Sequence, residues 1–371
     1  MKTLVFWIDS ITPREWESLR DRHLHHHFSN FKKRENKIIK TRPGPVHIWE
    51  ILTGQTPDKG PFMFDMVASK NSPYKWLLNV GLQNLGSNKF TRQIIFRLAR
   101  LFYGKRAFPP MQTPFYVLPY ISLSESSFVL EDIQKNKKNS RSLTSLSNHL
   151  SSKYVYWTQM PKKQIYQTVR ENDVTIIHFR FLDGIRHIHG PNSQESENKL
   201  IQVITDIDQL LGTFQDQVEL VLFFSDHTMS PVEFYFDVSD FVDVCKSEKL
   251  KFFINSPVIR YWGESKQAHN LLNSYEEQKI GKIVTSCELK KFNLPNNPAF
   301  GENIFWVAEG IHTIPDFYMG KSRPKGMHGY FKWDKVPFEA WSKNAELKRY
   351  IKKMGHLNDI LGFLEDVTAH K

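Results

Sequence analysis

The sequence predicts an α/β fold with a mostly parallel central sheet and an inserted cap region. Three short runs, rich in β-branched and aromatic residues, have the composition of strands that are buried on both faces. They span Leu4 to Ile8, Val174 to Leu182 and Val218 to Phe224. An amphipathic segment separates the last two runs, as the crossover helix of a βαβ unit would. Because such crossovers are right-handed, the strands that they join are expected to be parallel.

The first run is interpreted as a strand and not as a signal peptide. Lys2 precedes it, but the run is short and no small-residue cleavage site follows it. Asp9 comes directly after it instead. The chain has two cysteines, Cys245 and Cys287, which agree with a reducing compartment. We therefore expect an unprocessed cytoplasmic protein.

Composition and charge exclude several classes of protein. The 371 residues are 40% hydrophobic and 24% charged, which excludes an intrinsically disordered chain. The sequence contains no uncharged apolar run long enough for an ordinary transmembrane helix. The formal net charge of +11 favours an anionic partner such as phosphate, nucleic acid or acidic lipid.

The segment between the second and third runs is predicted to be a helix. Pro191-Asn192-Ser193 supplies a start signal, and Gly212 lies near the end. Its apolar residues recur at helical spacing: Leu200, Val203, Ile204, Ile207, Leu210, Leu211 and Phe214.

Residues 66 to 150 are expected to form a cap or lid inserted into a single domain that spans residues 1–371. The helical piece Phe90 to Tyr103 is aromatic and basic, which fits a nucleic-acid surface or a lid helix with a basic outer face. The polar stretch Glu131 to Ser152 is typical of a mobile excursion. Near the other end, Glu346 to Val367 predicts a surface helix broken near Gly355.

An aspartate follows each predicted strand. Asp9, Asp183 and Asp226 come immediately after their strands or within two residues. The carboxyl ends of parallel strands meet at one edge of the sheet, where α/β proteins bind their ligands. We therefore expect three carboxylates along that edge.

Three histidines extend this pattern. His187 comes four residues after Asp183 in a predicted turn, His227 is adjacent to Asp226, and His328 lies in a glycine-containing loop. One Asp–His pair alone is better explained by a capping aspartate and a surface histidine than by a metal site. Six oxygen and nitrogen ligands together are what two zinc-like ions need while they keep open positions for a substrate.

A second histidine-rich segment is interpreted differently. His23 and His25 to His27 lie among arginines and lysines, so a solvated helix end is favoured over a metal site.

The order of these motifs resembles the alkaline phosphatase superfamily, above all its type I phosphodiesterase/nucleotide pyrophosphatase branch. The similarity spans residues 3 to 330 and includes the Thr53-Gly54 helix end, the Asp-His motifs and the late His-Gly-Tyr. It implies a three-layer sandwich of the alkaline phosphatase type and two divalent metal ions, zinc or else manganese. It assigns Asp9, Asp226 and His227 to one ion, and it assigns Asp183, His187 and His328 to the other.

Two neighbours of these residues depart from the family pattern. Thr228 stands where the family has glycine after His227. Arg186 stands where the family has glycine. It is expected either to place a cation near a substrate phosphate or to form a salt bridge with a glutamate.

The nucleophile position also departs from the family. The resemblance implies a threonine or serine at the N-terminus of the helix that ends in Thr-Gly, predicted here from Pro45 to Leu52. Counting back nine residues from Thr53 gives Gly44, which has no side chain to attack with. Three explanations stay open: a substitution at Gly44, a shift of the nucleophile to Thr41, or binding of metals and an anionic ligand without covalent catalysis.

The resemblance implies a metal-dependent hydrolase of phosphate esters, with diesters favoured over monoesters. Its substrate would be an anionic phosphate ester or a nucleotide-like molecule. The alternative is a catalytically silent protein that keeps the metals and a phosphorylated ligand. A nucleic-acid-binding protein driven by the basic charge is a third, less favoured hypothesis.

Overall fold

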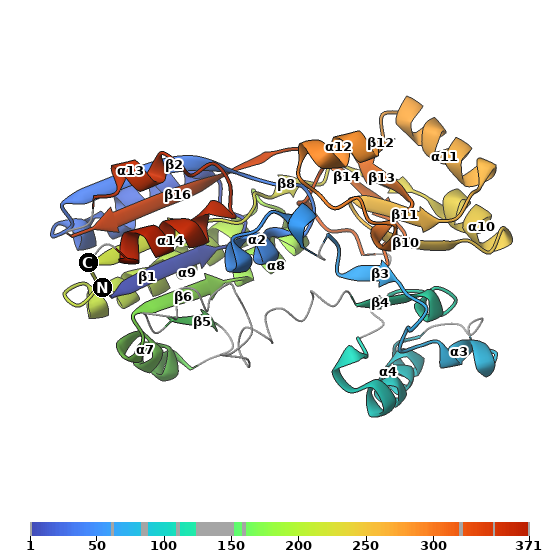
Figure 1. Cartoon of the computed structure of the whole chain (residues 1–371), viewed down its shortest axis with the longest axis horizontal. Helices are drawn as coiled ribbons and strands as arrows, with labels where there is room; N and C mark the ends of the chain where they lie inside the picture. Colours follow the sequence, from blue (N-terminus) through green and yellow to red (C-terminus); the bar gives the residue numbers. More distant parts are fainter. Residues whose placement is uncertain are drawn as a thin grey trace.

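The central sheet of the computed structural model has six strands in the order β2-β16-β7-β1-β6-β5 (Figure 1). The structure describes residues 2–60, 63–82, 88–108, 112–123, 152–157, 161–318, 322–343 and 346–369. The strands are β1 (Thr3–Ile8), β2 (Lys33–Thr41), β5 (Ser152–Tyr156), β6 (Val174–Phe179), β7 (Leu220–Phe224) and β16 (Asp334–Ser342). Only β16 runs against its neighbours β2 and β7, which confirms the mostly parallel central sheet.

Helices cover both faces of this sheet and make three layers. In β1, Leu4, Phe6 and Ile8 pack into one core cluster, and the alternating Val5 and Trp7 pack into the other. The first cluster includes residues of α1 (Pro13–Leu19), α7 (Lys162–Glu171), α8 (Phe181–His189) and α9 (Gln194–Phe214). The second includes residues of α2 (His47–Thr53), α13 (Lys348–Ile351) and α14 (Asp359–Ala369).

The predicted βαβ unit is present because its signals are satisfied locally. The Ser193 side chain caps α9 by accepting the N–H of Ser196, and Glu195 and Glu197 lie in the positive first turn.

The predicted helix end at Thr53-Gly54 is also present. Gly54 ends α2 in the left-handed conformation, with φ of +64°, that favours glycine at helix ends.

A second lobe surrounds a four-stranded sheet in the order β10-β11-β13-β12 (Figure 1, right). Its strands are β10 (Lys251–Asn255), β11 (Val258–Trp262), β12 (Gly281–Ile283) and β13 (Asn303–Val307), and its helices are α10 (Ser239–Ser247), α11 (Lys266–Glu277) and α12 (Ser286–Lys291). Short sheets pair β9 (Phe234–Asp237) with β14 (Ile311–Ile314), and β8 (Ser230–Pro231) with β15 (Gly326–Met327).

The region predicted to be a cap packs on this second lobe. It contributes β3 (Met66–Ala68), α3 (Trp76–Asn79), α4 (Lys89–Tyr103) and β4 (Ile121–Leu123), and its buried residues share one core with residues 238–317. The predicted polar excursion, up to residue 151, lies outside the described residues.

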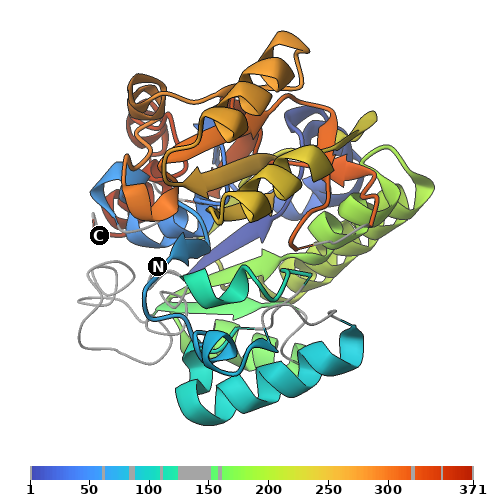
Figure 2. The same cartoon turned by 90° about the vertical axis from the view of Figure 1, so that its right-hand side faces the viewer.

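One interpretation of the sequence gave this helix a basic outer face, but the exposed face of α4 is also strongly apolar. Phe90, Leu101 and Phe102 are 72–80% exposed, while Arg92 is buried. Both views place the helix at the outer edge of the molecule (Figure 1, Figure 2). Among the described helices, none is long and apolar enough to cross a membrane.

The predicted end of the second strand was wrong. The second strand ends at Phe179, and α8 begins at Phe181, so Asp183 lies in a first helical turn instead of a turn that leaves a strand. The chain leaves the extended conformation at Arg180, with φ of −84° and ψ of −10°, and Leu182 then packs into the core from the first turn of α8. The C-terminal helix is broken around Gly355, as predicted: α13 and α14 lie on either side of this glycine, and their apolar residues are buried against the central sheet.

Candidate metal centre

Asp183 lies at the centre of a cluster of histidines. Its Oδ1 atom is 3.5 Å from His187 Nε2, 3.7 Å from His227 Nε2 and 3.6 Å from His328 Nε2. The same oxygen accepts a hydrogen bond of 3.1 Å from the Ser10 hydroxyl. The loop after β1, helix α8, the loop after β7 and the loop after β15 therefore meet at one carboxylate.

Helix α8 sets the spacing of its two site residues. Asp183 and His187 are four positions apart, so their side chains lie on the same face one turn from each other. The ring of His187 is fixed because its Nδ1 lies 2.8 Å from the carbonyl oxygen of Gly326.

Asp226 and His227 form a tight turn after β7. Asp226 Oδ1 accepts the N–H of His227 at 2.9 Å, and Asp226 Oδ2 is 3.6 Å from His227 Nε2. The Ser225 hydroxyl donates to the His227 carbonyl and accepts the N–H of Ile11. This serine thereby ties the loop after β7 to the loop after β1.

Charge and burial oppose each other at His227. Burial acts to lower the pKa of this imidazole, but the charges of Asp226, Asp183 and Asp9 raise it overall. Burial and the charge of Asp9 raise the pKa of Asp226.

Asp9 is buried and faces a histidine that the sequence analysis did not single out. Its Oδ1 lies 2.5 Å from Nε2 of His178, whose ring stacks on Trp7 with centroids 3.8 Å apart. Burial, followed by the charge of Asp183, raises the pKa of Asp9 to about 8. Burial lowers the pKa of His178 to about 3, so its imidazole is neutral at pH 7. Its position inside the apolar run of β6 hid His178 among core residues.

His328 completes the predicted set. Its ring stacks on His227 with centroids 3.7 Å apart and planes 9° from parallel. Burial, followed by the charges of His227 and His187, holds the pKa of His328 well below its usual range. Its buried Nδ1 has no hydrogen-bond partner among the described residues.

The donor set fits divalent cations of the zinc type. The Nδ1 atoms of His187 and His227 face backbone carbonyls, so each donates its N–H there and leaves the Nε2 lone pair facing Asp183. The separations of 3.5–3.7 Å are long for hydrogen bonds. Those of 3.5–3.6 Å that join His187 and His328 to Asp183, and His227 to Asp226, are close to the roughly 3.4 Å between two ligands of one tetrahedral ion with bonds of about 2.0–2.1 Å.

A further histidine, His47, belongs to this neighbourhood and was also missed. Potential ligand atoms of His47, Asp226 and His227 all lie within 4.8 Å of one another. No sequence motif pointed to His47, because its approach depends on how α2 is placed against the loop after β7.

Gly44 has a backbone conformation that favours glycine. Its φ is +84°, and its N–H donates to the carbonyl oxygen of Gly329 at 3.1 Å. A Cβ atom at this position would lie 3.5 Å from the ring of Trp306 and 3.9 Å from that of Phe64. A side chain at Gly44 would therefore point toward aromatic rings.

Thr41 is the last residue of β2 and is completely buried. Its hydroxyl lies 3.4 Å from the carbonyl oxygen of the next residue, Arg42. None of the contacts among the described side chains joins it to the aspartate–histidine cluster.

Arg186 serves a structural role. It is 1% exposed and forms a salt bridge with Glu15. It also donates to the carbonyl oxygen of Ser10. The salt-bridge alternative is therefore the one that the structure shows.

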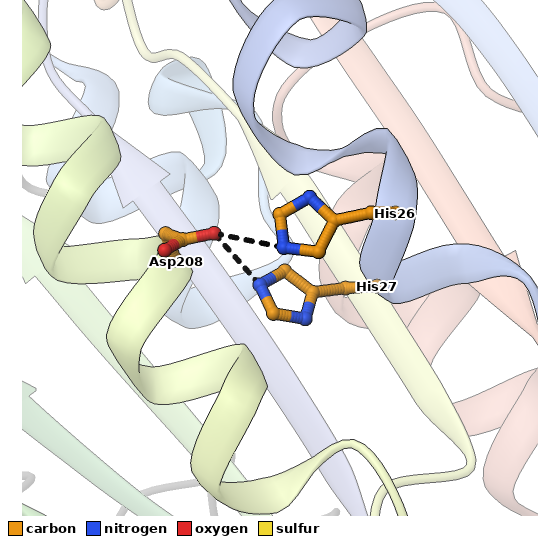
Figure 3. A group of neighbouring side chains, drawn as sticks. All are labelled: His26, His27 and Asp208. Atoms are coloured by element: carbon orange, nitrogen blue, oxygen red, sulfur yellow. Dashed lines mark hydrogen bonds and ion pairs between the residues drawn. The ribbon is translucent and has the colours of Figure 1, made fainter.

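A separate group of possible ligands lies on the surface. His26 Nε2 and His27 Nε2 are 3.4 Å and 2.7 Å from the same oxygen of Asp208 on α9 (Figure 3). The His26 side chain is 66% exposed, and ordinary ion pairing to Asp208 accounts for the group.

A pocket of about 210 Å³ adjoins the central cluster. Its lining includes His187, His328, Gly44 and the aromatic rings of Phe64 and Tyr318. The site therefore combines histidines with an adjacent partly apolar hollow.

The comparisons with known proteins agree with this fold. The family model for type I phosphodiesterase/nucleotide pyrophosphatase matches residues 85–331, and the chain belongs to that family. Among solved structures, murine ectonucleotide pyrophosphatase/phosphodiesterase 5, as an inactive threonine-to-alanine variant in complex with AMP, superposes with a TM-score of 0.60 at 14% identity. The murine protein in another structure gives 0.58 and the human one 0.56, both at 14% identity.

Each of these alignments covers 100% of this chain and 96% of the other. At this identity the likeness establishes the fold. No curated protein sequence matches the chain.

Proposed function

We propose that the chain is a metal-dependent hydrolase of phosphate diesters. One divalent cation would be held by Asp9, Asp226 and His227, and a second by Asp183, His187 and His328. The observation that carries the proposal is the convergence of three histidine Nε2 atoms on one oxygen of Asp183 at 3.5–3.7 Å. Zinc suits this mixture of imidazole and carboxylate best, with manganese as the alternative.

A cation with an open ligand position would supply Lewis acidity toward the phosphoryl oxygens and lower the pKa of water. The chain's own part is to hold the ligands in place and to exclude bulk water from buried carboxylates such as Asp9 and Asp226. The net charge of +11 favours the approach of an anionic substrate.

The adjacent pocket gives the substrate a place for its apolar part. Tyr318 is half-buried and lines the pocket with His187 and His328, while the buried ring of Phe64 forms part of the pocket wall. A nucleoside or aryl group fits this chemistry, because planar rings stack on aromatic side chains. The structural relative that was solved with AMP supports a nucleotide-like ligand.

Water, not a side chain of this protein, would attack the phosphorus atom. Gly44 has no hydroxyl, and the Thr41 hydroxyl lies buried against the Arg42 carbonyl. In this reaction the water oxygen bonds to phosphorus, the ester bond to the leaving group breaks, and the leaving oxygen takes up a proton. The configuration at phosphorus is therefore inverted.

A silent binding protein is the second candidate. The left-handed backbone at Gly44 favours it, because the position is built for glycine and not for a nucleophile. Such a protein would bind the cations and a phosphorylated ligand without turning the ligand over.

Metal analysis and turnover of an aryl phosphodiester test the proposal. We expect two bound zinc ions per chain and slow hydrolysis; Asp183→Asn should lose the second ion and the hydrolysis. A chiral phosphorothioate diester should be hydrolysed with inversion, whereas retention would establish a covalent intermediate. Bound zinc without turnover would favour the silent protein, and a chain that binds no divalent metal would overturn both candidates.

A further inference from the structure

His47 is a buried histidine beside the metal centre. Neither the sequence motifs nor the family resemblance gives it a role. It is the first residue of α2 and is 4% exposed. Its ring lies 5.4 Å from that of His227, measured between centroids. Its ligand atom forms a close group with those of Asp226 and His227.

The hydrogen bond of His47 fixes its tautomer. Nε2 lies 3.0 Å from the carbonyl oxygen of Arg42. A carbonyl can only accept, so Nε2 carries the proton and Nδ1 keeps its lone pair. Metal-binding histidines typically donate their second ring nitrogen to a carbonyl or carboxylate in this way.

The carbonyl that orients His47 is itself held firmly. The Arg42 side chain forms a buried ion pair with Glu50 of α2 and donates to the carbonyl oxygen of Phe292 at 2.7 Å. Burial, followed by the charge of His227, lowers the pKa of His47 to about 4, so the imidazole is neutral at pH 7.

We propose that His47 is a fourth protein ligand, through Nδ1, of the cation held by Asp9, Asp226 and His227. This inference rests on the proposed function, because it requires that cation to bind. Two carboxylates and two imidazoles make a complete tetrahedral set. This cation then has no coordination position left for the substrate. The cation held by Asp183, His187 and His328 has three protein ligands and keeps one coordination position open.

The two positions therefore differ in role. A closed four-ligand site is characteristic of structural zinc, and a three-ligand site is characteristic of catalytic zinc. The chain would then use one cation to organise the loops after β1 and β7 and the other to contact the phosphate.

Zinc titration of the metal-free protein against a chromophoric chelator tests this assignment. We expect the wild type to bind two ions, and His47→Gln to lose at least about 100-fold in affinity at one position, beyond the effect of removing a supporting hydrogen bond. His26→Gln is the matched control, because it removes a surface imidazole of the Asp208 group and should leave both affinities unchanged.

The outcomes separate the two proposals. If the wild type binds no zinc, the proposed function fails. If it binds two ions and His47→Gln binds both with wild-type affinity, the role of His47 alone is overturned. Cobalt adds a spectroscopic readout: His47→Gln should weaken the intense visible bands of tetrahedral Co²⁺ as water enters, and unchanged bands would contradict the inference.

A crystal structure of the zinc-loaded wild type keeps the inference testable if His47→Gln does not fold. The expected separation of His47 Nδ1 from zinc is about 2.0–2.1 Å. A water molecule in that ligand position, with the ring further away, would overturn the assignment.

Discussion

The N–H of Gly44 donates a hydrogen bond to the carbonyl oxygen of Gly329 over 3.1 Å, so the glycine at the nucleophile position is joined to the residue that follows His328. The same carbonyl accepts the indole N–H of Trp306 at 2.9 Å. A Cβ atom on Gly329 would lie 3.5 Å from Gly44 Cα, so the two backbones pack closely. The loop before α2, the loop of His328 and strand β13 are thus held together at one point.

A side chain at Gly44 is expected to destabilise the protein without creating activity. Gly44→Ala and Gly44→Thr should each lower the free energy of unfolding by about 1–2 kcal/mol, because L-residues are strained at positive φ. Turnover of an aryl phosphodiester should not rise in Gly44→Thr, since the new side chain faces Trp306 and Phe64. Denaturant unfolding and turnover measure the two effects.

Gly362→Ala is the matched control for the two substitutions at Gly44. Gly362 lies inside α14, exposed and with open space around a new Cβ, so alanine should stabilise the protein by about 0.5–1 kcal/mol. A Gly44→Thr protein as stable as the wild type and more active would show that the position tolerates a nucleophile.

Thr41→Val tests the remaining hydroxyl. Because the Thr41 side chain is buried against the Arg42 carbonyl, its replacement should leave kcat within about twofold of the wild type, far below the roughly 100-fold or greater effect of removing a nucleophile. Steady-state kinetics with a saturating diester give the answer. Complete loss of turnover in a folded Thr41→Val protein, with zinc still bound, would restore Thr41 as the nucleophile.

The metal-free protein should lose stability as the pH rises from 6.5 to 8. In the folded state Asp9 has a pKa of about 8, whereas an ordinary aspartate has a value of 3.8. The folded state therefore keeps a proton that the unfolded state has released, and this advantage disappears as the pH rises through 8. His47 and His178, with lowered pKa values, act in the opposite sense only below pH 6.5.

Melting temperatures measured in chelator at several pH values check this sign. In Asp9→Asn the melting temperature should fall less between pH 6.5 and 8 than in the wild type, because asparagine has no proton to lose in that range. Zinc affinity of the wild type should rise over the same interval as Asp9 ionises. A metal-free protein whose stability increases toward pH 8 would contradict the buried, protonated state of Asp9.

Removal of the central carboxylate should release zinc more completely than removal of a surface carboxylate. Asp183→Asn leaves three histidines without the oxygen that they face, so we expect a loss of zinc affinity above the roughly 10–100-fold seen when a supporting group is removed. Asp208→Asn, in the surface group of Figure 3, should keep both ions. Equal zinc content in the two variants would place the metal elsewhere.

Local pattern made much of the fold predictable. The runs ending at Ile8, Phe179 and Phe224 are apolar on both faces, so their burial could be inferred from residue type alone. The aspartates and histidines at their carboxyl ends could be grouped because parallel strands share an edge. The structure brings these six residues together, while their binding of metal stays a prediction.

The remaining features depend on long-range packing. His47 approaches Asp226 only because α2 is placed against the loop after β7, and His178 is hidden by the apolar residues around it in β6. The positive φ of Gly44 leaves no trace in composition or spacing. The break between Phe179 and Asp183 was misplaced because Phe181 and Leu182 continue the apolar run into a helix.

The geometry at Gly44 also limits how a nucleophile could be engineered into this protein. A side chain there would meet Trp306 and Phe64 at ordinary contact distances, but the positive φ would strain it, so the loop before α2 would have to take a new path as well. Conversion to a covalent route would thus require a redesigned loop in addition to the new residue.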